Sequence, residues 1–393
     1  MIAKLLRIAG FAIIAVHCLS TGQARASDAF EIDVVLPLTG GASFLGKAEQ
    51  EAFMLYEKLV SESGGIHGKP LKFVFHDDQS NPQTAVQLTN KIKAASPPVI
   101  IGSTLAGICN AMAPLVKKGP VMYCLSPALR PQTGGFVFSS SVSTVGLSEA
   151  LLRYFGERGW KKIGLITSTD ASGQDAYKII TSLAGKGDYA DMSIVEDAKF
   201  NPTDVSASAQ VQRIKGADPD AVIVWTTGGP VGTVLKAIRD AGLDKPIGTT
   251  DGNMTFAQMT QYAPFMPKEL YIPAPQWLEA NTLGQSEQAV TAKHAFFRSF
   301  KDANLVPDGS ATFAWDPALV VTEALRQLPE GASAEQLRDH INSMQGIGGI
   351  NGVYDFKKDP QRGLDKSNVV VTIWDPGIKN WKAVSDLGGI PLK

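Results

Sequence analysis

The sequence has few residues of the kinds that hold metal ions or form reactive clusters. Among 393 residues there are three cysteines and five histidines, and no two cysteines form a CxxC pair. The histidines are scattered, so the spacing typical of a zinc site is missing. GxSxG and HExxH segments are absent too, which leaves the common motif-bearing hydrolases and metalloproteases without support. We therefore expect no metal, no cofactor and no catalytic residue.

An excess of charge of one sign is also missing. The chain has 37 basic and 38 acidic residues, and the basic ones form no run. Nucleic-acid-binding surfaces require clustered lysine and arginine, so we expect no nucleic-acid partner.

Long apolar runs are confined to the N-terminus. Lys4 and Arg7 precede the apolar stretch 8–16, which is shorter than the roughly 20 residues of a membrane span. Ala24 and Ala26 provide the small side chains that a signal peptidase reads. We expect residues 1–26 to be a signal peptide and the mature chain to be exported and soluble. Cleavage would leave 34 basic against 38 acidic residues, a formal net charge of −4.

Two cysteines, Cys109 and Cys124, follow the expected cleavage point. An exported protein meets an oxidising compartment, where a disulfide is permitted. Cys109 is expected early in a helix and Cys124 at the end of the next strand, which could bring them close. Two buried cysteines that act as small apolar residues are equally compatible with the pattern. The sequence leaves both possibilities open.

The mature chain alternates between short apolar strands and amphipathic helices. In the first half Asn81 and Pro82 form a cap with proline at the first helical position. The expected strands are 32–38, 71–76, 99–102 and 121–125, and the expected helices are 48–61, 82–94 and 109–118. Strands that alternate with helices predict a parallel sheet covered on both faces.

The same alternation restarts near residue 148. The expected strands are 162–166, 192–195, 221–225, 245–249 and 369–374, and the expected helices are 149–158, 174–185, 205–215, 231–241, 291–303, 314–328 and 334–344. Two α/β halves of similar size predict two lobes with a crevice between them. Ligands of open α/β sheets bind beyond the carboxyl ends of the strands, so the residues after each strand are the candidate site.

Three strand exits of the first half carry suitable residues. A glycine-rich turn at 39–46 contains Phe44, which could lie against an apolar ligand. The small-residue turn 102–107 ends in Leu105, Ala106 and Gly107, and free N–H groups at a helix start suit a carboxylate. In the segment 126–130, Ser126 and Ala128 precede Arg130, whose guanidinium fork matches a carboxylate. An ordinary turn and a solvent-facing arginine are the simpler alternatives.

Polar, glycine-bearing exits also follow the strands of the second half. They contain Ser172, Thr226, Gly228 and Asp251. Asp251 would be the natural partner of a ligand ammonium group, although a helix cap or turn residue is an equally good interpretation.

Together, several segments resemble the type I periplasmic solute-binding proteins of ABC transporters, in the branch that includes the leucine/isoleucine/valine-binding proteins. The similarity covers essentially the whole mature chain. The segments that carry it are Pro37-Leu38-Thr39-Gly40 with Phe44 and Gly46, Gly64-Gly65-Ile66-His67-Gly68-Lys69-Pro70-Leu71, Asp77-Asp78 with Asn81-Pro82, Ile101-Gly102, Leu125-Ser126-Pro127-Ala128, and Pro219-Asp220-Ala221 leading into Trp225.

The resemblance implies an α/β fold of two Rossmann-like lobes joined by a three-segment hinge that closes around a ligand. We expect crossovers near 141–145, 272–275 and 352–356. Lobe 1 would comprise 27–143 plus 276–352, and lobe 2 would comprise 144–275 plus 353–393. The resemblance further implies a monomeric, periplasmic, non-enzymatic protein whose partner is a membrane permease. An exported enzyme and a sensory receptor that use the same crevice are the alternatives.

The family pattern also bears on the ligand. Amino-acid-binding members place a serine, a threonine and a tyrosine at positions that look like Ala106, Arg130 and Ser172 here. These departures favour a small aromatic carboxylate, and a branched-chain or other hydrophobic amino acid is the alternative. The predicted ligand-binding residues are Phe44, Leu105, Ala106, Gly107, Ser126, Ala128, Arg130, Ser172, Thr226, Gly228 and Asp251.

Overall fold

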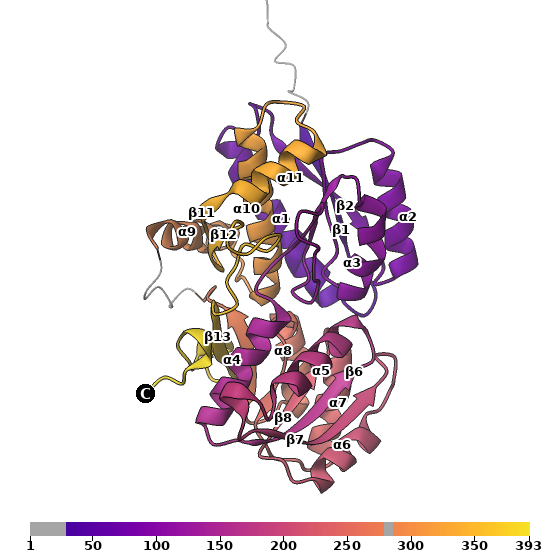
Figure 1. Ribbon diagram of the computed structural model, residues 1–393, viewed down its shortest axis with the longest axis vertical. Helices are drawn as coiled ribbons and strands as arrows, with labels where there is room; N and C mark the ends of the chain where they lie inside the picture. Colours follow the sequence, from indigo (N-terminus) through magenta and orange to yellow (C-terminus); the bar gives the residue numbers. More distant parts are fainter. Residues whose placement is uncertain (1–28, 279–285) are drawn as a thin grey trace, which may run out of the picture.

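The computed structural model describes residues 29–278 and 286–393, which form two α/β lobes, one above the other in Figure 1. The predicted signal peptide, 1–26, lies outside the described residues. No helix within the described ranges has both the length and the apolar character that a membrane span needs.

The first lobe is built on a five-stranded parallel sheet with the order β2-β1-β3-β4-β5. Its strands are mostly buried on both faces, as expected for a sheet covered by helices. The strands are β1 (Phe30–Leu36), β2 (Leu71–Asp77), β3 (Val99–Ile101), β4 (Val121–Cys124) and β5 (Val137–Ser139).

Helices from two distant parts of the chain complete this lobe (Figure 1). They are α1 (Ser43–Glu62), α2 (Pro82–Lys93), α3 (Ala106–Met112), α9 (Glu287–Asp302), α10 (Gly309–Gln327) and α11 (Ala334–Ser343). A small antiparallel pair, β11 (Gln345–Gly349) and β12 (Gly352–Asp355), follows α11.

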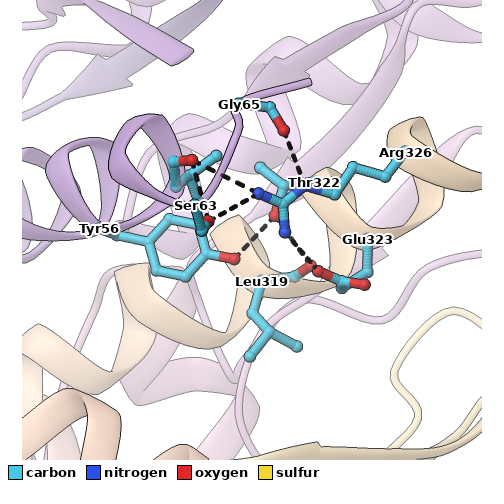
Figure 2. A network of polar contacts seen from close by, with 8 residues as sticks. Tyr56, Ser63, Gly65, Leu319, Thr322, Glu323 and Arg326 are labelled. Carbon is cyan, nitrogen blue, oxygen red and sulfur yellow. Dashed lines mark hydrogen bonds and ion pairs between the residues drawn. The ribbon is translucent and has the colours of Figure 1, made fainter. Parts of the chain in front are cut away.

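The long helices α1 and α10 pack along each other, and Figure 2 shows the polar contacts at one end of this interface. The hydroxyls of Tyr56 and Thr322 lie 2.7 Å apart. Arg326 donates to the carbonyl of Gly65 over 2.9 Å and to the hydroxyl of Ser63 over 3.0 Å. These bonds fix α1, whose N-terminal turn faces the second lobe.

The second lobe contains a seven-stranded mixed sheet with the order β14-β13-β10-β9-β8-β6-β7. The strands β7, β6, β8, β9 and β10 are parallel, and β13 and β14 add antiparallel strands at one edge. The bounds are β6 (Lys162–Ser168), β7 (Ser193–Phe200), β8 (Ala221–Trp225), β9 (Ile247–Gly248), β10 (Leu270–Pro275), β13 (Val369–Asp375) and β14 (Asn380–Ala383).

The helices of the second lobe are α4 (Thr144–Glu157), α5 (Ala171–Leu183), α6 (Ser208–Gly216), α7 (Pro230–Asp240) and α8 (Phe256–Tyr262). Short 3-10 segments are η1 (Ala113–Val116) in lobe 1, and η2 (Gly187–Tyr189), η3 (Asp251–Asn253), η4 (Ala263–Phe265) and η5 (Leu387–Gly389) in lobe 2. Several helices begin at a side-chain cap. Asn81 accepts from the N–H groups of Gln83 and Thr84, which is the cap that the sequence predicts.

The chain crosses between the lobes three times. The first crossing lies between β5 and α4, and the second lies between β10 and α9. The third follows Gly363, because residues 353–363 pack on lobe 1: Phe356 contacts Phe138, and the N–H of Ser139 donates to the carbonyl of Gln361. This crossing is therefore later in the chain than the expected 352–356, since the β11–β12 pair holds that segment on lobe 1.

The predicted α/β architecture of two lobes is confirmed. Nearly every expected helix and strand is present, with ends shifted by a few residues. The expected strand at 245–249 shrinks to β9. Among the α-helices and strands that the structure describes, six had not been predicted: β5, β10, β11, β12, β14 and α8.

Candidate functional site

A cavity of about 400 Å³ lies between the two lobes. Most of its lining comes from the segments that follow β1, β3 and β4 in lobe 1 and β6, β8 and β9 in lobe 2. Such a volume is typical of sites for small molecules, and a position beyond the carboxyl ends of parallel strands is the usual place for them.

The first part of the lobe 1 wall is the turn between β1 and α1, where Ala42 and Leu45 line the cavity. Close packing of this turn requires glycine at position 46, because a Cβ there would lie 2.3 Å from the carbonyl oxygen of Pro37. Gly46 thus lets the start of α1 pack directly against Pro37, and its neighbour Leu45 lines the cavity.

The second part of this wall is the start of α3. Thr104, Leu105, Ala106 and Gly107 line the cavity. Leu105 precedes α3 and has no polar side chain that could cap the helix. The N–H groups in the first turn of α3 therefore have no hydrogen bond from a capping side chain.

A disulfide between Cys109 and Cys124 fixes α3 to the end of β4. Of the two possibilities that the sequence left open, the structure has the disulfide. Since Ser126, Pro127 and Ala128 follow β4 and line the cavity, the bond joins two adjacent parts of the wall.

The lobe 2 wall is formed by Asp170, Ser172, Trp225, Thr227 and the 3-10 turn η3. Asp170 caps α5 by accepting from the N–H of Gly173 over 2.9 Å. Glycine is required at that position, because a Cβ would lie 2.1 Å from the carbonyl oxygen of Ser168. The cap leaves Ser172 at the cavity surface.

Asp251 is the buried ionisable group of this wall. It is 2 % exposed and lies at the start of η3. One carboxyl oxygen accepts from the Thr250 hydroxyl over 3.0 Å, and the other lies 3.5 Å from the Ser141 hydroxyl. Burial raises the pKa of Asp251 to about 7. The carboxyl group therefore titrates near neutral pH, and a cation beside it would stabilise its charged form.

No lysine, arginine or histidine is among the described residues that line the cavity. The ionisable side chains there are Asp170 and Asp251, and the remainder is largely apolar, with Leu45, Trp225 and Phe313 as the largest side chains. Within the described ranges no three histidine, cysteine or carboxylate side chains gather as a metal site would require. The arrangement can enclose a small, mainly apolar molecule and can hold a cationic group.

The structure brings seven of the eleven predicted site residues to the cavity: Leu105, Ala106, Gly107, Ser126, Ala128, Ser172 and Asp251. The other four, Phe44, Arg130, Thr226 and Gly228, are not part of its lining.

Each of the four has a physical reason for its position. Arg130 forms an ion pair with Asp175 on α5, with 2.6 Å between the charged atoms. Thr226 is fully buried, because alternation after β8 turns Trp225 and Thr227 to the cavity instead. Gly228 donates its N–H to Asn253. Phe44 lies in the first turn of α1, where its neighbour Leu45 faces the cavity.

Sequence reasoning missed several lining residues. Leu45 and Trp225 are the sequence neighbours of the predicted residues Phe44 and Thr226. Their position at a strand exit could therefore have indicated them. Phe313 comes from α10, 185 positions after Ala128 and 268 positions after Leu45. Nothing local in the sequence marks it.

Comparison with known proteins agrees with this geometry. A family model described as periplasmic binding protein matches residues 30–372. The chain belongs to the periplasmic binding protein family. A curated relative in Pseudomonas aeruginosa is a leucine-, isoleucine-, valine-, threonine-, and alanine-binding protein, 21% identical over 242 residues. The match spans 60% of this chain and 62% of that relative, less than two thirds of its length.

Solved structures of similar fold include other binding proteins. An extracellular ligand-binding receptor from Rhodopseudomonas palustris has a TM-score of 0.79 at 20% identity, with 90% of this chain and 99% of that chain covered. A branched-chain amino acid transporter substrate-binding protein from Streptococcus pneumoniae in complex with isoleucine gives 0.74 at 20% identity, covering 91% and 99%. An ABC transporter solute-binding protein from R. palustris in complex with benzoate gives 0.71 at 19% identity, covering 93% and 97%. This periplasmic binding protein thus shares its fold with proteins of both ligand classes.

Proposed function

We propose that this periplasmic binding protein is the substrate-binding component of an ABC transporter. It captures a small, mainly apolar solute between its lobes and delivers it to a membrane permease. Family membership, the interlobe cavity and its apolar lining support this proposal. The seven predicted residues that line the cavity are the ligand contacts under this proposal.

The ligand that the cavity suits best carries an ammonium group. The observation behind this choice is Asp251, a buried carboxyl group in a cavity whose described lining has no basic side chain. An ammonium beside Asp251 would form a charge-assisted hydrogen bond, whereas a ligand carboxylate there would be repelled. The case for an aromatic carboxylate used Arg130 and Phe44, and neither lines the cavity. We therefore favour a hydrophobic amino acid over a benzoate-type acid.

A carboxylate of the same ligand would lie at the opposite wall. The first turn of α3 presents backbone N–H groups there, and Thr104 and Ser126 add hydroxyls. A zwitterion would thus bridge the lobes, with its ammonium at lobe 2 and its carboxylate at lobe 1. The apolar side chains of Leu45, Trp225 and Phe313 would enclose the remainder of the molecule.

Affinity as a function of pH tests the ligand class. Because the pKa of Asp251 is about 7, the carboxylate becomes protonated as the pH falls from 8 to 6. Binding of L-leucine measured by calorimetry should then weaken, by at most about tenfold per pH unit. Binding of benzoate should strengthen over the same range, since a neutral Asp251 repels it less.

The variant Asp251→Asn is the matched test, because it keeps the shape of the side chain and removes its charge. It should bind L-leucine weakly and without pH dependence in this range. Ligand at about 100 times its Kd should raise the stability of the wild type by about 2.7 kcal/mol in a thermal unfolding assay. Stabilisation by benzoate and not by L-leucine would reverse the choice of ligand, and loss of the added molecule on long incubation would favour an enzyme.

A further inference from the structure

Arg362 is a buried cation at the junction of the lobes. It is 7 % exposed and lies in the segment that precedes the third crossing. One terminal nitrogen donates to the carbonyls of Ser140 and Ser141, over 3.1 and 3.0 Å. The other donates to the carbonyls of Pro127 and Leu129, over 3.2 and 2.8 Å. All four acceptors are thus backbone oxygens.

The base of this side chain is held firmly on lobe 1. The neighbouring Gln361 accepts at its backbone carbonyl from the N–H of Ser139 and at its side chain from the N–H of Gly134. Gln361 is fully buried. The guanidinium of Arg362 therefore extends from a fixed point toward the segments that it bonds.

One bonded segment lines the ligand cavity, and the other reaches a residue of its lining. Pro127 lines it between Ser126 and Ala128. Ser141 belongs to the first crossing, has a φ of 62°, and places its hydroxyl 3.5 Å from a carboxyl oxygen of Asp251 in the other lobe. One side chain thus contacts the lobe 1 wall directly and approaches the lobe 2 wall through Ser141.

Arginine is the residue type that this position requires. Its planar fork presents two terminal nitrogens in fixed directions, each able to donate two hydrogen bonds. A lysine has three donors on one nitrogen, so it could serve one pair of carbonyls and leave the other pair without a donor. A buried carbonyl oxygen without a donor lowers the stability of the folded protein. The segments that carry such oxygens would then move until the oxygens find other hydrogen-bond donors.

We propose that Arg362 is a positioning residue for ligand binding: it holds the segment 126–129 and Ser141 in one fixed arrangement, and so links the first crossing to the shape of the cavity. This inference rests on the proposed function, because it assumes that the interlobe cavity is where the solute binds.

Hydrogen exchange of the full chain, read by mass spectrometry, tests the link without a ligand. Arg362→Lys should speed exchange of backbone amides in 126–130 and also in 251–254, which Arg362 does not touch, by about tenfold. The matched control is Phe73→Leu, which reduces a buried ring contact with Phe53 at the far side of lobe 1. It should lower overall stability and leave these two segments as in the wild type.

Binding is the second readout. Calorimetry with L-leucine and, separately, benzoate should give an about tenfold higher Kd in Arg362→Lys for whichever probe the wild type binds, and an unchanged Kd in Phe73→Leu. If the wild type binds neither probe, the proposed ligand class fails, and the exchange experiment still decides the role of Arg362. Equal exchange at 126–130 and 251–254 in both variants would overturn the inference, as would equal Kd values. If Arg362→Lys does not fold, Ser141→Ala replaces it and should speed exchange at 251–254 alone.

Discussion

At the scale of single residues, Glu49 stands out as a buried acid in lobe 1. It is fully buried on α1, one turn after Leu45, and no cation lies close enough to form an ion pair with it among the described residues. Burial raises its pKa from 4.5 to about 8, against the opposing effect of a hydrogen bond from Thr104, and the charges of Asp78 and Asp308 add to the shift. Glu49 is therefore mostly neutral at pH 7, which avoids the cost of an unpaired buried charge.

Glu49 should make the protein less stable as the pH rises. Between pH 4.5 and about 8 the unfolded chain releases this proton while the folded chain keeps it, so rising pH favours unfolding. Glu49→Gln should make the decline in the free energy of unfolding shallower, by up to about 1.4 kcal/mol per pH unit. Urea titrations at several pH values would measure this. Glu62→Gln, an exposed change on the same helix, is the control and should leave the slope unaltered.

The positions of the strand exits could be predicted from the sequence, but the directions of several side chains at those exits could not. Seven of the predicted residues line the cavity because parallel strands end at one edge of each sheet. Thr226 and Arg130 do not, because direction depends on alternation and on partners that lie far away in sequence. The partner of Arg130 is Asp175 in the other lobe, and no local pattern could indicate it.

At the scale of elements, the pair α3 and β4 is the most constrained part of the cavity wall. The disulfide between Cys109 and Cys124 closes a loop with a sequence separation of 15. Because it joins the middle of the short helix α3 to the end of β4, it limits how far the N–H groups of α3 can move from Ser126.

The double variant Cys109→Ala/Cys124→Ala should lose about 3 kcal/mol of the free energy of unfolding. Without the cross-link the unfolded chain regains conformational entropy, which favours unfolding. Guanidinium titrations of the oxidised wild type and the variant would measure the loss. The wild type in a reducing buffer should match the variant. If reduction and mutation had no effect on the midpoint, the disulfide would have no role in stability.

Elements with a strong local pattern were predictable, and those defined by distant partners were not. The caps and amphipathic helices follow from neighbouring residues, as at Asn81. By contrast β5 has three residues, and β10 contains two prolines, Pro273 and Pro275, which argue against a strand in isolation. Both are strands because a neighbouring strand pairs with them.

At the scale of the whole molecule, contacts across the cavity hold the lobes together. Arg130 of lobe 1 pairs with Asp175 of lobe 2, and the N–H of Gly229 in lobe 2 donates to the carbonyl of Gly41 in lobe 1 over 3.3 Å. The two sides thus meet directly around the rim of the cavity, in a closed arrangement.

Arg130→Ala should shift the ligand-free protein toward an open arrangement, because it removes an attraction that exists only when the lobes meet. Small-angle X-ray scattering should show a larger radius of gyration than in the wild type, and saturating L-leucine should reduce the difference. The control Lys245→Ala breaks an ion pair with Asp218 inside lobe 2 and should leave the radius unchanged. Identical scattering from the two variants would mean that Arg130 does not hold the lobes.

The interlocking of α1 with α10 has a consequence for how the protein is made. Tyr56 and its partner Thr322 are separated by 266 positions, and the sheet of lobe 2 receives β13 and β14 only from residue 369 onward. Neither half can complete its interior until nearly the entire polypeptide has emerged from the ribosome. Both lobes therefore depend on late segments of the chain, and a truncation before residue 369 would leave lobe 2 without part of its core.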